Sequence, residues 1–295
     1  MSLFKKNKIL VTHNSRFHAD DIFSTATLSI LLDGNIKVVR TRDEEEIKKA
    51  DFVYDVGGIY DPSINRFDHH QVGGAGKREN GIPYAAFGLV WKTYGEKVCG
   101  SKEIADRIDE SLVQSIDAHD NGINTYTIIG EVGPYLIESV FGAFRPTWKE
   151  GDDYDAPFME LVDFAKRFLE RKIKRKQDAL EASSFIEKAY QSASDKRLIV
   201  LDDDYPWNEE IMKHEEPLYV IWPNLGVWRL GCVRKEEESF VNRKSLPEAW
   251  AGLRDEELAK VSGVSDATFC HNGRFLAVAK SKEGAIKLAE KALLA

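Results

Sequence analysis

Residues 52–71 read Phe52-Val-Tyr-Asp-Val-Gly-Gly-Ile-Tyr-Asp-Pro-Ser-Ile-Asn-Arg-Phe-Asp-His-His-Gln71 and carry the most information about the fold. The apolar run at 52–54 predicts a buried strand, and a carboxylate, Asp55, follows at its end. Open α/β sheets place their chemistry beyond the carboxyl ends of their strands. Further along stands a contiguous Asp68-His69-His70. Carboxylate oxygen and imidazole nitrogen together form a ligand set for divalent manganese, iron, cobalt or zinc.

The segments before this stretch alternate between strand and helix patterns. Residues 8–12 and 37–41 read as strands, apolar residues recur at helical spacing over 20–32, and 43–50 reads as a short charged helix. Gly34 follows the longer helix as a C-terminal stop. This order is typical of a parallel sheet with crossover helices. We therefore predict an α/β fold whose first domain has a mainly parallel sheet flanked by helices.

The second half of the chain predicts a smaller α/β domain. Ser101 can cap a helix that runs towards Ile116, and residues 157–191 read as one long helix that ends before Ser192-Ala-Ser194. We place the domain boundary there, between 1–191 and 192–295. Later strands are predicted at 197–201, 218–222, 227–230 and 267–270, with a final helix at 281–294.

Composition narrows the classes of partner. The chain has 295 residues, a net charge of −8 and three scattered cysteines, which fits about two domains in a reducing compartment. The acidic balance argues against holding long nucleic acid by charge alone, but bound metals can supply positive charge for a short phosphorylated substrate. The sequence has no apolar run of about 18 residues, so no membrane span is expected. We expect a cytoplasmic protein.

Further potential ligands lie where the first strand ends. His13 follows that strand, and His18, Asp20 and Asp21 open the next helix. Taken singly, either acid is typical of a helix N-cap, and a lone histidine is more often a surface or core residue. Neighbouring strand ends meet in a parallel sheet, however, so these groups can converge with Asp55 and residues 68–70. So many ligands exceed one structural zinc and suit two ions about 3.5–4 Å apart, the arrangement that attacks phosphorus esters.

These motifs resemble the MYG1 family, also known as UPF0160. The similarity rests on His-x4-His-x-Asp-Asp at 13–21, Asp-Val-Gly-Gly at 55–58 and Arg-Phe-Asp-His-His-Gln at 66–71. Ile-Asp-Ala-His-Asp-Asn-Gly at 116–122, Ile-Trp-Pro-Asn at 221–224 and Phe-Cys-His-Asn-Gly-Arg-Phe at 269–275 extend it over nearly the whole chain. That family resembles the DHH phosphoesterase superfamily. The resemblance implies a DHH-like dimetal domain at 1–191 and a substrate-binding domain at 192–295.

By this resemblance, the first motif of the superfamily falls on His13, His18 and Asp20. It has one extra residue, and an imidazole replaces the middle carboxylate; Asp21 is an alternative to Asp20. The second motif falls on Asp55, which would bridge the metals.

The third motif makes His69 a ligand and places His70 on a substrate phosphate, with Asp68 orienting a histidine. The fourth motif falls on Asp117, and Asp120 is the alternative.

Substrate contacts are expected from cations outside the metal motifs. Arg42 follows the second strand, and Arg145 lies between Phe144 and Trp148, which suits phosphate contact and base stacking. In the second domain, the expected substrate-binding residues are Arg229, His271 and Arg274.

The resemblance implies a metal-dependent phosphodiesterase. We expect a 3′-5′ exonuclease on short RNA or DNA that attacks with a metal-bound hydroxide, using two Mn²⁺ ions, although Mg²⁺, Co²⁺, Fe²⁺ or Zn²⁺ would also fit. One alternative is hydrolysis of a small compound such as pyrophosphate, a cyclic dinucleotide or a bisphosphorylated nucleotide. Another is a protein that binds metal or nucleic acid without catalysis. A homodimer is a candidate assembly.

Overall fold

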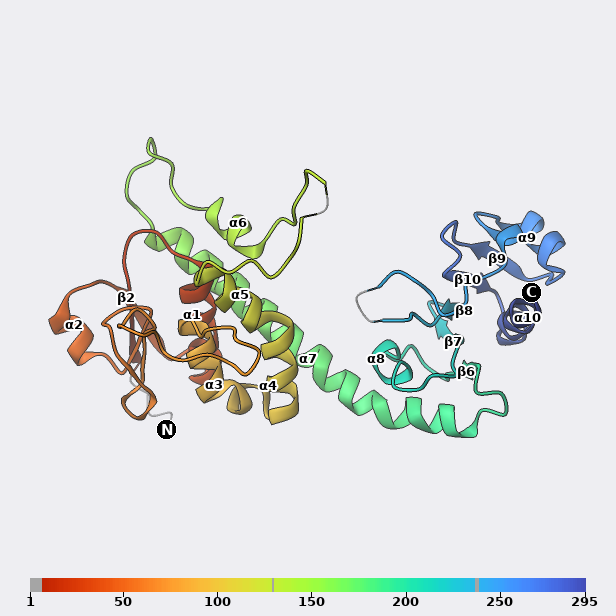
Figure 1. Cartoon of the computed structure of the whole chain (residues 1–295), viewed down its shortest axis with the longest axis horizontal. Coiled ribbons are helices and arrows are strands. Elements are labelled where there is room, and N and C mark those ends of the chain that lie inside the picture. Colours follow the sequence, from red (N-terminus) through yellow and green to blue (C-terminus); the bar gives the residue numbers. More distant parts are fainter. Residues whose placement is uncertain (1–6, 129, 237–238) are drawn as a thin grey trace, which may run out of the picture. The chain divides into compact units, whose positions relative to one another are not determined.

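The computed structural model describes residues 7–128, 130–236 and 239–295. The chain divides into two compact units, of which one ends at Lys176 and the other begins at Gln177. This junction lies inside the long helix α7 (Asp155–Ser192), drawn in green in Figure 1. The predicted boundary after residue 191 corresponds to the end of α7, and the assignment of roles to the two domains remains a prediction.

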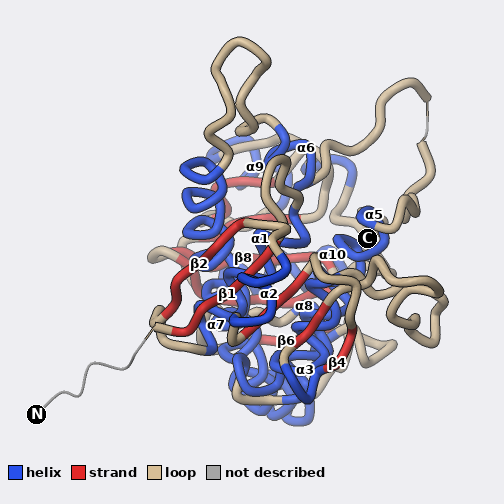
Figure 2. The backbone as a smooth tube through the Cα atoms, turned by 90° about the vertical axis from the view of Figure 1, so that its left-hand side faces the viewer, coloured by secondary structure: helices blue, strands red, loops and turns tan. Residues whose placement is uncertain are grey.

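The first unit is built on a five-stranded sheet, as the sequence predicts. Its strand order is β2-β1-β3-β5-β4, and every neighbouring pair is parallel except β4 and β5. Figure 2 shows β2 and β1 side by side among the strands drawn in red. The pattern did not predict β4 or β5, because two-residue strands show no periodicity. The bounds are β1 (Lys8–Thr12), β2 (Ile36–Arg40), β3 (Phe52–Tyr54), β4 (Tyr60–Asp61) and β5 (Arg66–Phe67).

Alternating side chains cover the two faces of this sheet. Leu10 and Tyr54 pack with α1 (Ala19–Leu31) and α3 (Ala86–Cys99) on one face. Val11 points to the other face, where the short helix α2 (Glu44–Lys49) covers the sheet. The two-residue period of a strand therefore places helices on both sides, as a parallel sheet requires.

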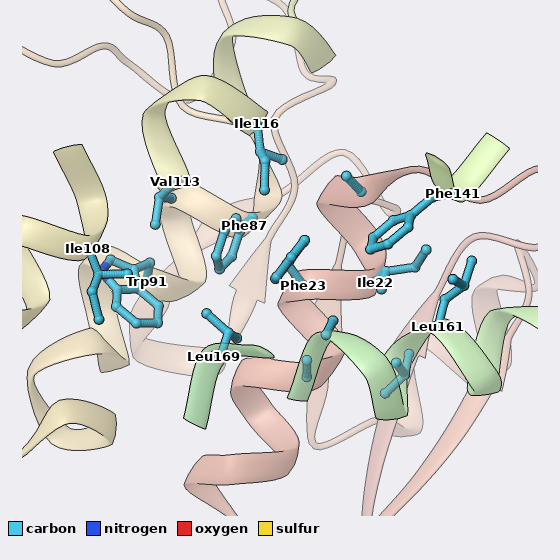
Figure 3. Packing of buried hydrophobic residues seen from close by; sticks show 14 of the residues in the cluster. Ile22, Phe23, Phe87, Trp91, Ile108, Val113, Ile116, Phe141, Leu161 and Leu169 are labelled. Atoms are coloured by element: carbon cyan, nitrogen blue, oxygen red, sulfur yellow. The ribbon is translucent and has the colours of Figure 1, made fainter. Parts of the chain in front are cut away.

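A helical layer extends the core away from the sheet. Figure 3 shows Phe23 of α1 and Phe87 of α3 side by side, and their ring centroids lie 5.3 Å apart. Ile116 and Leu161 complete the same cluster. Ser101 caps α4 (Lys102–Ile108) in this layer, as predicted, by accepting a hydrogen bond from the Ile104 amide. The remaining elements are η1 (Pro62–Ile64), the π-helical segment η2 (Asp109–Val113), α5 (Gln114–Asp120) and α6 (Ile137–Gly142).

The second unit contains the other five-stranded sheet, with order β6-β7-β8-β10-β9. The four strands that the pattern predicts are present, whereas β10 and α9 were not predicted. Within the described ranges, no helix is both long and apolar enough to cross a membrane. The elements are β6 (Leu198–Val200), α8 (Asn208–Ile211), β7 (Tyr219–Asn224), β8 (Val227–Cys232), η3 (Glu248–Trp250), α9 (Asp255–Ser262), β9 (Ala267–Cys270), β10 (Leu276–Ala279) and α10 (Lys282–Leu294).

Candidate metal centre

Three strand ends bring the predicted ligands of the first unit together. His13 follows β1, Asp55 follows β3 and Asp68 follows β5, and these strands are parallel neighbours. Asp55 is buried and has a left-handed backbone, with φ of 55°. Few non-glycine residues adopt this conformation, and such strain is concentrated at functional sites. The backbone therefore turns sharply at the residue that lies at the centre of the cluster.

Each oxygen of the Asp55 carboxylate faces a different imidazole. Its Oδ2 lies 3.1 Å from Nε2 of His13, and its Oδ1 lies 3.4 Å from Nε2 of His69. Asp55 belongs to one potential ligand group with His13 and His18, and to another with His69 and His70. A carboxylate shared in this way has the geometry of a bridge between two ions.

Hydrogen bonds orient the side chains at the first strand end. Nδ1 of His13 lies 3.0 Å from the Asn14 carbonyl, so a proton there leaves the Nε2 lone pair facing Asp55 and Asp21. Asp21 uses Oδ1 to accept from the His18 amide at the start of α1, and its Oδ2 lies 3.3 Å from Nε2 of His13. Asp21 thus stabilises the helix start and also contacts the cluster.

The third potential ligand group combines Asp20, His69 and Asp120. Oδ2 of Asp120 lies 3.2 Å from Nε2 of His69. Asp117 is three residues earlier on the same helix, but its carboxylate pairs with Arg78 instead. Of the two alternatives from the fourth motif, the geometry therefore favours Asp120 as the ligand.

Several buried atoms in this cluster lack a hydrogen-bond partner within the described part of the chain. They are Nε2 of His13 and His69, Oδ2 of Asp21 and Oδ1 of Asp55. They lie close to one another, but their directions do not satisfy hydrogen-bond geometry. Buried polar atoms are normally satisfied, and unsatisfied ones call for an ion or water. Lone pairs that converge in this way fit divalent cations held by mixed imidazole and carboxylate ligands.

The charges in the cluster shift the pKa values of both histidines. Burial lowers the pKa of His13, but Asp55 and Asp21 outweigh it and raise the value to about 9. Burial acts likewise on His69, where Asp120 and Asp55 raise the pKa to about 11. Despite burial, the two imidazoles hold the pKa of Asp55 below its usual range. Without metal, the protons on His13 and His69 therefore balance the negative charge of the neighbouring carboxylates. Bound cations would take over that role.

Asp68 orients the loop that carries both histidines of the third motif. Its Oδ1 accepts from the His69 amide at 2.7 Å, and its Oδ2 accepts from the Gly58 amide at 2.5 Å. The same Oδ1 lies 2.8 Å from Nδ1 of His70, whose side chain is 62% exposed. The hydrogen bond to Asp68 raises the pKa of His70. His70 is thus an accessible imidazole whose protonated form Asp68 stabilises, and that form suits contact with a phosphate.

Two cavities adjoin the cluster. The first, of about 270 Å³, is lined by Arg42, His70 and ligand-group residues, including His13 and Asp55. The second, of about 360 Å³, is lined by Arg145, among others. His18, His119 and Asp120 line both cavities, which places Arg42 and Arg145 beside the same centre.

The N-terminus of α3 holds two of the acidic side chains. The amides of Ala86 and Phe87 donate to Asp20 at 3.1 and 2.6 Å, and the amide of Gly88 donates to Asp117 at 2.9 Å. Ala85 at the N-cap has no side chain that could satisfy these amides. Carboxylates from α1 and α5 therefore cap α3, in the position that the helix dipole favours.

Arg78 locks the same arrangement from the glycine-rich loop after His70. Its Nη1 donates to Asp117 at 2.7 Å, and its Nη2 donates to Asp109 at 2.6 Å. The Arg78 side chain is buried. Because Asp117 and Asp120 share α5, this ion pair also restrains the position of the candidate ligand Asp120.

The substrate-binding residues predicted in the second unit lie on and beside its sheet. Arg229 is in the middle of β8, opposite Trp222 of β7. His271 follows β9, and its Nδ1 accepts from the Gly273 amide at 2.9 Å. Arg274 lies in the turn before β10 with a left-handed backbone, φ 58°. Their role in substrate binding remains a prediction.

Sequence reasoning missed three residues of the first unit. His119 was visible between Asp117 and Asp120 in the fourth motif, but was not weighed as a cavity residue. Glu138 lies on the six-residue helix α6, which offers no periodic signal. Arg78 sits in a loop, so its burial depends on contacts distant in sequence.

Comparisons with known proteins agree with the motif resemblance. A family model described as "Uncharacterised protein family (UPF0160)" matches residues 9–293. Proteins named "MYG1 exonuclease" from Homo sapiens and Rattus norvegicus are each 33% identical over 321 residues, covering 96% of this chain and 85% and 84% of theirs. The "MYG1 protein" of Dictyostelium discoideum is 30% identical over 319 residues, covering 96% of each chain. The chain therefore belongs to the MYG1 family.

Proposed function

We propose that this protein is a metal-dependent phosphodiesterase that acts as an exonuclease. The observation that carries the proposal is Asp55, whose two oxygens face His13 and His69 in separate potential ligand groups. The exonuclease names of the human and rat relatives support the choice of nucleic acid as substrate. The arrangement also suits the DHH-like phosphoesterase chemistry that the motifs suggest.

The ligands would be His13, His18, Asp20, Asp55, His69 and Asp120, with Asp21 and Asp117 in supporting positions. Divalent ions bound there would acidify a water and neutralise charge on the phosphoryl oxygens. Asp55 would hold the two ions together, and buried Asp20 and Asp120 would balance their charge.

The remaining residues would bind and orient the strand. His70 would donate to a phosphate oxygen, while Asp68 holds its imidazole in place and favours the protonated form. Arg42 lines the cavity next to it and has no hydrogen bond or ion pair among the described residues, so its guanidinium is available to a phosphate. Arg145, Arg229, His271 and Arg274 complete the proposed substrate-binding set.

The finer features follow the family resemblance. We propose two Mn²⁺ ions, 3′-5′ polarity and short RNA or DNA as substrate, in a cytoplasmic protein that could act as a homodimer. The cavities of about 270 and 360 Å³ are of the size that holds one small ligand or nucleotide.

Cleavage of labelled oligonucleotides of graded length tests the proposal. With Mn²⁺, wild-type protein should release nucleotides from one end, and Asp55→Ala should lower the rate by at least about 100-fold, because an interaction made by the reacting centre is lost. Asp61→Asn, at the end of β4 directly before η1, is the control and should stay active. A wild type that cleaves only pyrophosphate or cyclic dinucleotides would favour the small-substrate alternative. A wild type that binds metal but cleaves no phosphate ester would favour a non-catalytic role.

A further inference from the structure

The cavity beside Arg145 carries a carboxylate that the metal ligand groups do not use. Glu138 of α6 lines this cavity, and its Oε1 is buried with no hydrogen-bond partner among the residues that the structure describes. A buried acceptor without a donor is costly and indicates a missing partner. The terminal torsion of a glutamate is soft, so a small turn of the carboxylate offers either oxygen to the cavity.

The position of the cavity relates Glu138 to the reacting phosphate. Its lining shares His18, His119 and Asp120 with the cavity that contains Asp55 and His70. A strand whose scissile phosphate lies at the metal ligands would therefore place a neighbouring nucleoside here. The floor includes apolar groups, Ala19 and Ile116, which suit a sugar or base.

Arg145 does not cancel the acceptor character of Glu138. Its Nε donates to the Phe17 carbonyl at 2.9 Å, and its Nη2 donates to the same oxygen. Two of its donors are therefore committed to the backbone, whereas Glu138 Oε1 is uncommitted.

We propose that this cavity binds the terminal nucleoside of the strand, and that Glu138 accepts a hydrogen bond from its free ribose hydroxyl. Glu138 thereby selects ends that carry a hydroxyl over ends that carry a phosphate. A hydroxyl donates to a carboxylate, whereas a phosphate has only acceptors to offer and repels it. This inference rests on the proposed exonuclease function and adds the chemistry by which the end of the strand is recognised.

Three oligonucleotides of one sequence test the selection, carrying hydroxyls at both ends, a 5′-phosphate only, or a 3′-phosphate only. With Mn²⁺, wild-type protein should cleave one of the phosphate-ended strands at least about tenfold more slowly than the hydroxyl-ended strand. Glu138→Gln should narrow that difference to within about threefold, because the neutral amide still accepts from a hydroxyl but no longer repels a phosphate. Glu138→Ala should also lose the preference.

Glu160→Gln is the matched control, since Glu160 is an exposed carboxylate of α7 outside the cavity, and it should keep the wild-type preference. Thermal melting of each variant checks that it is folded. Equal cleavage of all three strands by wild type, or an unchanged preference in folded Glu138→Gln, would overturn the inference while leaving the exonuclease function standing. No cleavage of the hydroxyl-ended strand by wild type would overturn both.

Discussion

Asp55 contacts the imidazoles of His13 and His69 and belongs to two potential metal-ligand groups. The sequence indicates its place, because a polar residue directly after a buried strand lies at a sheet edge. It does not indicate the left-handed backbone, φ 55°, or that each oxygen faces a separate imidazole. Those features depend on where β1 and β5 lie relative to β3, which no local pattern specifies. The residue type was predictable, whereas its position between the imidazoles of His13 and His69 required the fold.

Binding of Mn²⁺ should release protons from His13 and His69. Without metal, His13 and His69 have pKa values raised to about 9 and about 11, so both are protonated at pH 7. A metal ligand must be neutral imidazole, and binding must therefore displace these protons. Apparent affinity should rise as pH is raised from about 6 to about 8. Calorimetric titrations in buffers of different ionisation enthalpy count the protons. A binding enthalpy that is the same in every buffer would contradict this expectation.

Asp68 should control the charge of His70. The hydrogen bond between them raises the pKa of His70, so Asp68→Asn should shift it back towards about 6.5. Because the folded pKa is raised, this interaction stabilises the fold below the unfolded pKa, and its contribution is lost as pH rises through the folded pKa. An NMR titration of the imidazole in metal-free protein measures the shift. Asp61→Asn should leave the His70 titration unchanged, and an equal shift in both variants would argue against a direct effect.

At the scale of elements, α3 organises the acidic side of the centre. Its first amides hold Asp20 of α1 and Asp117 of α5, and Arg78 fixes Asp117 from a loop. The sequence predicted a capped helix after Ser101. It could not predict that carboxylates from other elements cap α3, because the two residues of each contact are far apart in sequence. The separation is 67 positions for Asp20 and Phe87 and 29 positions for Asp117 and Gly88. The sequence also did not indicate the π-helical segment η2 (Asp109–Val113), because apolar residues keep their helical spacing through it.

Gly88→Ala should destabilise the first unit. An added Cβ would lie 1.8 Å from Oδ2 of Asp117, which is buried and tied to Arg78. Alanine favours a helix by about 1 kcal/mol over glycine, but forcing a methyl group into a packed interior costs about 1–3 kcal/mol or more. Denaturant unfolding should therefore show a net loss of stability, together with weaker Mn²⁺ binding as α5 moves.

Gly133→Ala is a suitable comparison, because its added Cβ would make only ordinary contacts, the nearest at 3.7 Å to Ile128. It should unfold like wild type. If Gly88→Ala were equally stable and bound Mn²⁺ normally, the proposed link from α3 through Asp117 to Asp120 would be wrong.

At the scale of the whole molecule, the order of helices and strands was the most predictable property. Strong periodic segments gave the parallel sheet of the first unit, α7 and four strands of the second sheet. The sequence did not predict several elements, among them the two-residue strands β4 and β5, and also β10 and α9. β10 is stabilised by pairing with β8 and β9 on both sides, which a single sequence does not reveal.

Some properties of the candidate site could likewise be predicted from the sequence, and others could not. The positions of the candidate ligands His13 and His69 near strand ends could be predicted from the sequence. The choice between Asp117 and Asp120 was not, because both lie on α5 and only their contacts in the fold distinguish them: Asp117 pairs with Arg78, whereas Asp120 faces His69.

The central claim is that Asp55 joins two divalent ions in one centre, and counting bound Mn²⁺ tests it most directly. Metal-free wild type, Asp55→Asn and the control Asp61→Asn are each dialysed against Mn²⁺, and the metal retained per folded chain is measured. We expect about two ions per chain for wild type and Asp61→Asn, the number that phosphoester chemistry of this kind uses, and fewer than about one for Asp55→Asn. Wild type that retains no Mn²⁺, or Asp55→Asn that retains as much as wild type, would contradict the account.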